Sequence, residues 1–270
     1  MRGTRHKILI TLCVSALVLI GAGCGSTKKG QKTIPVPQKS DLSITLTSAY
    51  DPLTTGLEPN KKQTVSFVIA NEQKEIISQF KSNDEHIATL LIARSDLSSV
   101  DYIEPSFDPT IGQFSFVYTF NELGVYRLFA NITPAEGHAE ILSYDIMVGG
   151  LAAGTQKKLV PNKNPFDIVD GYVVRYNIDD NIRAGKKITY TLEVAKDGTP
   201  VSLEPLPDNM YQSLVLEAGT LSMIPIEKNS DNKLSFAATF PQQNTYLIAT
   251  FFKSEGKIHF SRYIIPVKAK

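Results

Sequence analysis

Two successive sets of short, strand-like runs constrain the fold of this chain more than any other feature. The runs are rich in Val, Ile, Phe, Tyr and Thr, and Gly, Pro, Asn and Asp separate them. The first set comprises LSITLTSAY, QTVSFVIAN, IATLLIARS, FSFVYTF, GVYRLFANI and ILSYDIMV, and the second GYVVRYNI, KKITYTLEVA, YQSLVLEAG, LSFAATF, TYLIATFF and IHFSRYIIPV. No long segment has a convincing helical period. The pattern therefore predicts an all-β protein.

The two sets also match each other along the sequence. Three pairs carry the match, at offsets of 125, 120 and 120 residues: Thr64–Ala70 with Thr189–Ala195, Phe114–Phe120 with Leu234–Phe240, and Tyr126 with Tyr246. Six or seven short strands in about 100 residues suit an antiparallel sandwich. We therefore predict two tandem immunoglobulin-like β-sandwich repeats, over residues 41–149 and 165–270, joined by a Gly-, Lys- and Pro-rich linker over 150–164.

The N-terminus has the three-part plan of a secretory signal. A basic start, MRGTRHK, precedes 13 residues without a charge, and Gly21–Cys24 supplies small residues before a cysteine. The run Ile20–Cys24 resembles the lipobox of bacterial lipoproteins, which implies a signal peptide over 1–23 and a lipid on Cys24. Residues 24–40 are polar and lysine-rich with two prolines, so we expect a flexible tether there. An uncleaved membrane anchor is the alternative, although Gly21, Gly23 and Gly25 would weaken its helix.

Charge and cysteine content narrow the function classes. The formal net charge is +1, and three basic residues lie in the predicted signal, so the body is close to neutral. No basic stripe points to nucleic acid. The only cysteines are Cys13 and Cys24, both at the N-terminus, so the mature body would hold neither a disulfide nor a free thiol. We expect a lipid-anchored protein on the extracytoplasmic face of a bacterial cell membrane.

Both repeats resemble modules of secreted bacterial proteins related to the YtkA-like, heavy-metal-associated group. The motifs that carry the resemblance are Asp96-Leu97, Tyr102–Pro105, Gly112–Phe114, Leu123–Asn131 and Pro134, and in the second repeat Asp170–Tyr172, Ala184-Gly185, Lys196–Val201, Leu203–Pro205, Phe240-Pro241, Tyr246 and Gly256–His259. The resemblance implies a sandwich with a His-x-His-Pro metal motif where this chain has Tyr102–Pro105. It also implies a further histidine near Thr89. In the second repeat, Gln212 and Glu227 stand near the corresponding positions, so the motif is degenerate in both repeats.

A rebuilt metal site would have few residues to use. Glu104 could bind Cu²⁺ or Zn²⁺ together with His86 or His138, because carboxylate and imidazole suit both ions. Glu136, His138 and Glu140 share one face if their segment is extended. We nevertheless interpret Glu104 as a solvated residue at a strand end, residues 136–140 as the polar face of a hairpin, and His259 as a packing residue. We expect no metal and no cofactor.

Motifs for catalysis are missing. The chain has no His-Glu-x-x-His, no Gly-x-Ser-x-Gly, and no phosphate-binding loop in its body. The sequence therefore predicts a non-catalytic binding or scaffolding module of the cell envelope with a protein partner. A copper- or zinc-handling protein is the alternative, and a hydrolase with dispersed carboxylates is a third.

Overall fold

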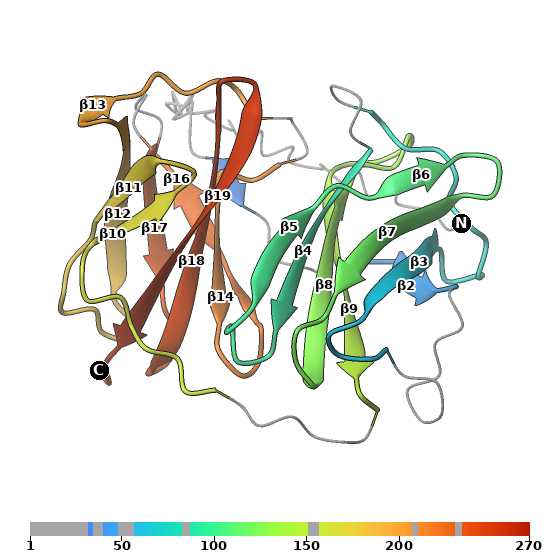
Figure 1. The fold of residues 1–270 in the computed structure, drawn as a ribbon, viewed down its shortest axis with the longest axis horizontal. Helices are drawn as coiled ribbons and strands as arrows, with labels where there is room; N and C mark the ends of the chain where they lie inside the picture. Colours follow the sequence, from blue (N-terminus) through green and yellow to red (C-terminus); the bar gives the residue numbers. More distant parts are fainter. Residues whose placement is uncertain are drawn as a thin grey trace, which may run out of the picture.

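The computed structural model describes residues 32–34, 40–47, 57–82, 87–150, 157–206, 210–229 and 234–270. These residues form two β-sandwiches that lie side by side (Figure 1). No helix among them is long and apolar enough to cross a membrane. The predicted signal peptide, Cys24 and His86 lie outside the described residues.

The first repeat consists of two four-stranded antiparallel sheets. One has the order β2-β3-β7-β6 and the other β5-β4-β8-β9. The strands are β2 (Ser43–Leu46), β3 (Lys62–Ala70), β4 (Ala88–Arg94), β5 (Val100–Ile103), β6 (Ser106–Asp108), β7 (Gln113–Thr119), β8 (Gly124–Ile132) and β9 (Glu140–Val148). Their facing side chains form a core around Phe67, Phe114 and Phe120. This arrangement confirms the predicted β-sandwich.

The second repeat has the same plan. Its inner sheet has the order β15-β14-β18-β19, and its outer sheet has the order β1-β16-β17-β12-β11-β10, with β13 paired to β12. The strands are β1 (Lys32–Ile34), β10 (Phe166–Val169), β11 (Tyr172–Asn177), β12 (Lys187–Lys196), β13 (Thr199–Pro200), β14 (Ser213–Glu217), β15 (Met223–Ile224), β16 (Ile226–Lys228), β17 (Leu234–Thr239), β18 (Asn244–Ser254) and β19 (Lys257–Val267). Along β19, buried and partly exposed residues alternate, as expected for a strand with one face in a core.

The matched sequence segments occupy equivalent strands. Thr64–Ala70 lies in β3 and Thr189–Ala195 in β12, and each strand pairs with the strand that carries the next matched segment, β7 or β17. The hydroxyl group of Tyr126 donates to the carbonyl oxygen of Glu122 (3.1 Å), and that of Tyr246 donates to the carbonyl oxygen of Gln242 (2.9 Å). Each bond spans four residues, as in the tyrosine corner of immunoglobulin-like sandwiches. The two repeats therefore share local geometry as well as sequence.

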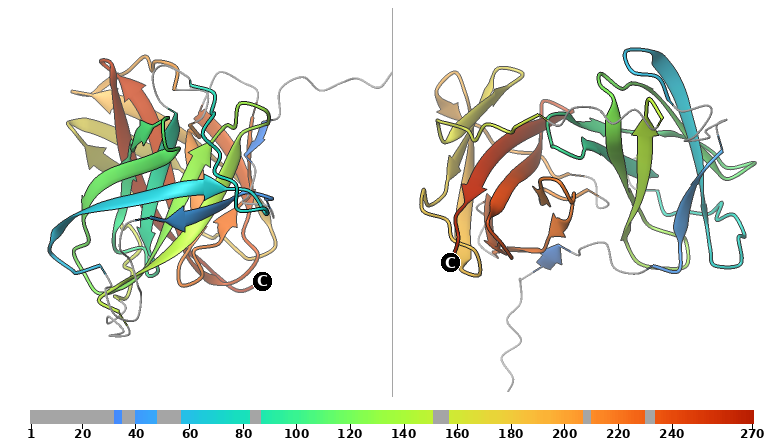
Figure 2. Two further views of the ribbon diagram at one scale, coloured as in Figure 1. Left: turned by 90° about the vertical axis from the view of Figure 1, so that its right-hand side faces the viewer. Right: turned by 90° about the horizontal axis from the view of Figure 1, so that it is seen from below.

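The segment that we interpreted as a tether contributes one strand to the fold. β1 pairs antiparallel with β16, through the registers Lys32 with Lys228 and Ile34 with Ile226. In Figure 2 (right) this blue strand lies against the orange strands of the second repeat, away from the repeat that follows it in sequence. The predicted tether is therefore not free along its whole length, because residues 32–34 extend the outer sheet of the second repeat.

The described end of the linker is also held in place. The amide of Asn162 donates to the carbonyl oxygen of Ile264 (2.9 Å), and the amide of Ile264 donates to Asn162 Oδ1 (2.7 Å). Lys157 donates its amide to Asp96 of the first repeat (2.7 Å). Residues 157–162 thus bond to both repeats.

Candidate functional site

The two repeats pack together through their equivalent inner sheets. All seven residues of β4 are buried, and they alternate between two cores: Leu90 and Ile92 belong to the first repeat's own core, whereas Leu91 and Ala93 belong to the core of the second repeat. The strand β14, its equivalent, is also buried along its whole length. The sheet β5-β4-β8-β9 is therefore covered on both faces, which gives the molecule four stacked sheets (Figure 2).

The apolar part of this interface brings together aromatic and aliphatic side chains from both repeats. The first repeat contributes Leu91, Val100, Phe129 and Ile141, which cluster with Leu214, Leu216, Leu247, Ala249 and Phe251 of the second. Burying a side chain of this size stabilises by about 1.5–3 kcal/mol. The repeats are thus held as one body by a continuous hydrophobic layer, which is more than a flexible connection would provide.

Tyr102, the first residue of the segment where the resemblance implies a metal motif, lies in this interface. It sits in β5 opposite Leu91, and its ring meets Phe251 of the second repeat edge-on, with ring centroids 5.5 Å apart. Its hydroxyl group donates to Glu104 Oε1 (2.9 Å). Burial, together with the nearby Glu104 carboxylate, raises the pKa of Tyr102 well above its ordinary value. The residue where the resemblance implies a histidine packs one repeat against the other.

The remaining metal candidates lie on the surface or in other contacts. Glu104 and His138 are exposed. Gln212 accepts a hydrogen bond from Lys228 Nζ (2.8 Å), and Glu227 forms an ion pair with Lys187 (2.6 Å). Among the residues that the structure describes, no three His, Cys, Asp or Glu side chains are grouped so that they could hold a metal ion.

His259 is buried in the second repeat. Its Nδ1 lies 2.7 Å from Asp170 Oδ2, and its ring stacks on Phe252, with centroids 5.0 Å apart. Tyr172 covers it at 4.7 Å between ring centroids. The packing role that we expected from the sequence agrees with these contacts.

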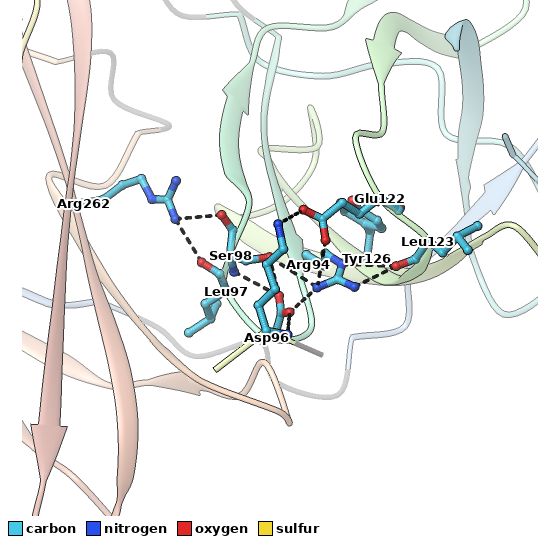
Figure 3. Close-up of polar contacts among 9 residues, drawn as sticks. Arg94, Asp96, Leu97, Ser98, Glu122, Leu123, Tyr126 and Arg262 are labelled. Carbon is cyan, nitrogen blue, oxygen red and sulfur yellow. Dashed lines mark hydrogen bonds and ion pairs between the residues drawn. The ribbon is translucent and has the colours of Figure 1, made fainter. Parts of the chain in front are cut away.

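A buried ion pair lies at the edge of the interface, and sequence analysis missed it (Figure 3). Arg94, only 2% exposed, pairs with Asp96 and donates from Nη2 to the carbonyl oxygen of Leu123 (2.8 Å). Asp96 also accepts from Ser98 Oγ (2.7 Å) and from the Lys157 amide (2.7 Å). Burial raises the pKa of Asp96, but the hydrogen bonds from Ser98, Lys157 and Arg94 outweigh it and leave the pKa below its ordinary value.

The turn after Arg94 is itself a contact between the repeats. Arg262 of β19 donates from Nη2 to the carbonyl oxygen of Leu97 (2.9 Å), and the amide of Gly219 donates to the carbonyl oxygen of Ser95 (2.8 Å). Arg127 reaches the carbonyl oxygen of Thr220 (3.0 Å). Polar bonds thus fix the orientation of two repeats whose attraction is mainly apolar.

The apolar layer leaves a pocket at its other end. Thr89, Tyr102 and Asn131 of the first repeat line it together with Met210, Tyr211 and Phe251 of the second. The pocket has about 330 Å³ of empty space, part of it open to solvent. No short motif marks these six residues, because they come from five separated segments that only the docking of the repeats brings together.

Solved structures similar to this chain include an alpha-2-macroglobulin, an adhesin and a putative membrane-anchored protein. Salmonella alpha-2-macroglobulin matches 87% of this chain with 15% of its own, at 9% identity and a TM-score of 0.27. The Escherichia coli adhesin FdeC matches 87% of this chain with 66% of its own, at 11% identity and a TM-score of 0.25. A putative membrane-anchored protein from Corynebacterium diphtheriae matches 84% with 57%, at 11% and 0.23.

Fewer proteins match this chain in sequence than in structure. No curated protein matches the chain. This chain spans about 15% of the length of the alpha-2-macroglobulin that it resembles. Over residues 167–269, which cover most of the second repeat, it matches the model of a family described as a domain of unknown function (DUF8832).

Proposed function

We propose that this protein is a lipid-anchored, non-catalytic binding module on the extracytoplasmic face of a bacterial envelope, with a protein as its partner. The observation that carries the proposal is the face-to-face packing of the two inner sheets, which makes one body of two sandwiches. Such a body can present edges and loops at fixed distances from each other. The lipobox-like Ile20–Cys24 supports the anchor.

The edge strand β6 is the surface that we assign to the partner. In the second repeat, β1 covers the equivalent edge strand, β16, whereas β6 ends its sheet. An extended segment can add to such an edge through main-chain hydrogen bonds. Ile111, 54% exposed, follows β6 closely and offers an apolar contact. β1 on β16 shows in this same chain how a strand of three residues adds to a sheet of this type.

The anchor is tested by replacing one cysteine at a time. Cys24→Ala should release the protein from membranes or stall its processing, because the lipid would have no attachment point. Cys13→Ala is the matched control, since it removes the other cysteine and should leave the protein on the membrane. Unchanged membrane retention of Cys24→Ala would favour an uncleaved helix instead.

The partner surface is tested by site-specific photo-crosslinking on cells. A crosslinker at the exposed Ser106 of β6 should capture the partner, whereas one at the exposed Arg175 of β11 should not. Capture at both sites, or at neither, would contradict the assignment to β6.

Stoichiometric Cu²⁺ or Zn²⁺ uptake that is lost in Glu104→Ala or His138→Ala would replace the proposal with a metal-handling function.

A further inference from the structure

A row of four apolar residues crosses the outer sheet of the second repeat. Ile168 of β10 pairs with Val173 of β11, Val173 pairs with Ala195 of β12, and Ala195 pairs with Pro200 of β13. Residues that lie directly opposite each other in antiparallel strands share one face of the sheet. The row is about 14 Å long, because neighbouring strands lie about 4.8 Å apart.

This row lies on the side of the sheet that faces away from the core. Ile168 is 64% exposed, and Pro200 is also exposed. The other two members are partly exposed, whereas Val174 and Val194, which follow or precede them in the strands, are buried. Contiguous apolar side chains on an outer surface are typical of an interaction site.

A pair of opposite charges lies beside the apolar row, two residues further along the same strands. Arg175 of β11 is directly opposite Glu193 of β12, and both side chains are exposed. Asn177 Nδ2 donates to Glu193 Oε1 (3.0 Å), which keeps this carboxylate on the outer face. The face therefore carries a positive charge on β11 and a negative charge on β12.

The face is complementary to itself about a twofold axis that runs along the strands between β11 and β12. A second copy rotated about this axis places its β13 over β10 and its β12 over β11. Pro200 of the second copy then covers Ile168, and Glu193 of the second copy faces Arg175. Each contact occurs twice, as in any isologous interface. The strands of the two sheets would be aligned, which is a common mode of packing between β-sheets.

The turns next to the row also carry acidic residues, and they would approach each other in this pairing. Asp197, in the β12–β13 turn, would lie near Asp170 of the second copy. The Asp170 carboxylate, however, is bonded within its own chain, because Oδ2 lies 2.7 Å from His259 Nδ1. The attraction between Arg175 and Glu193 is thus the main electrostatic contribution to the pairing.

We infer that this outer face of the second repeat, formed by the apolar row and the Arg175–Glu193 pair, binds the same face of a second copy of this chain. The inference goes beyond the proposed function, and it needs neither the lipid anchor nor the edge of β6. A photo-crosslinker at Arg175 should then link two copies of this chain, and the product, at twice the mass of the chain, is distinguishable from the partner captured at Ser106.

Charge reversal provides the decisive test. The full-length protein, in detergent with micelles in excess, should sediment as a dimer. Arg175→Glu and Glu193→Arg should each weaken the dimer about tenfold or more, because each brings like charges together twice. An equimolar mixture of the two variants should form a dimer again, since each variant then faces the charge that complements it. A wild type that stays monomeric throughout the concentration series, a dimer that survives either reversal, or a mixture that stays monomeric would overturn the inference.

The apolar row is tested separately by Ile168→Asp. This variant places a carboxylate against Pro200 of the second copy, so the dimer should be lost while the circular dichroism spectrum stays unchanged. Ile76→Asp is the matched control, because Ile76 is 50% exposed and lies in the first repeat, and it should leave the dimer intact. A dimer that persists in Ile168→Asp, or one that is lost equally in Ile76→Asp, would contradict the assignment to this face.

Discussion

The two repeats place opposite charges at the same buried position. Arg94 ends β4 opposite Tyr126, and Glu217 ends β14 opposite Tyr246, so each lies beside the tyrosine corner of its own repeat. Arg94 is 2% exposed and Glu217 is 3% exposed. The fold therefore accepts either charge at this position, provided that the neighbours complement it.

The neighbours differ accordingly. Glu122 Oε2 lies 3.8 Å from Arg94 Nη1, whereas the equivalent Gln242 donates to Glu217 (2.6 Å). Gly124 has φ +129°, and a Cβ there would lie 3.4 Å from Arg94 Nη2. The equivalent Asn244 instead donates to Glu217 (3.0 Å). Both repeats have a charged, hydrogen-bonded side chain at the end of a buried strand. The sign of that charge matches the residues around it.

Removing the cation, Arg94, should destabilise the protein more than removing the anion, Glu217. Arg94→Met should lower the free energy of unfolding by about 3–5 kcal/mol, because it breaks a buried ion pair and removes the donors to the Leu123 carbonyl oxygen. Denaturant unfolding measures the change. Arg127→Met is the control: Arg127 and Asp145 are partly exposed, so the loss should be about 1 kcal/mol. Equal losses in the two variants would show that the burial of Arg94 has no special weight.

Replacing the anion, Glu217, should lower the free energy of unfolding by a smaller amount. Glu217→Gln keeps one acceptor oxygen but turns an amide toward groups that already donate, among them Thr220 Oγ1 (2.9 Å). We expect a loss of about 1–3 kcal/mol in the same unfolding experiment. Glu193→Gln, at an exposed carboxylate on β12, should change stability little. If Glu217→Gln cost more than Arg94→Met, the proposed ranking of the two sites would be wrong.

Both carboxylates, Asp96 and Glu217, should contribute less to stability at low pH. Burial raises the pKa of Glu217, but hydrogen bonds from Asn244, Gln242 and Thr220 outweigh it, and the pKa falls below the ordinary 4.5. The pKa of Asp96 is likewise below 3.8. Each carboxylate therefore contributes stability that is complete above its ordinary pKa and is lost as the pH falls through the lowered value. Melting temperatures should decline below about pH 4.5, and less steeply in Glu217→Gln.

The tyrosine corners should give the smallest effect. Tyr126→Phe removes one bond to a carbonyl oxygen, and we expect a loss of about 1 kcal/mol. Tyr246→Phe should cost somewhat more, since the hydroxyl group also donates to Glu217 (3.2 Å), whose charge adds to burial in raising the pKa of Tyr246 to about 12. Thermal unfolding of the two variants side by side provides the measurement. A larger loss in Tyr126→Phe would reverse the comparison.

The strands and the internal repeat could be predicted because their signals are local and periodic. Segments such as Thr64–Ala70 combine β-branched and aromatic residues over the length of one strand, and the same composition recurs in Thr189–Ala195. The sandwich follows from this pattern, and the structure confirms it. The recurrence of Tyr126 as Tyr246 also marked equivalent places, although their corner geometry appears only in three dimensions.

The interface and its polar groups could not be predicted in this way. Arg94 and Glu217 end apolar runs, where a charge normally indicates a strand that reaches solvent, yet both are buried and bond to turns distant in sequence, at Leu123 and Gln242. Asn131 stands in GVYRLFANI, which gives no sign that its amide is covered by a second repeat. The three residues of β1 are too few for a periodic signal. Each of these features depends on contacts between segments far apart in sequence.

The position of β1 determines the length of the segment between the proposed lipid on Cys24 and the folded body. With the lipid that we propose on Cys24, eight residues lead to Lys32, and a fully extended chain of that length spans roughly 29 Å. If Ser40 were instead the first residue bound to the folded body, this segment would be about twice as long. With that lipid in place, docking of β1 on β16 would hold the second repeat within roughly 29 Å of the lipid headgroups.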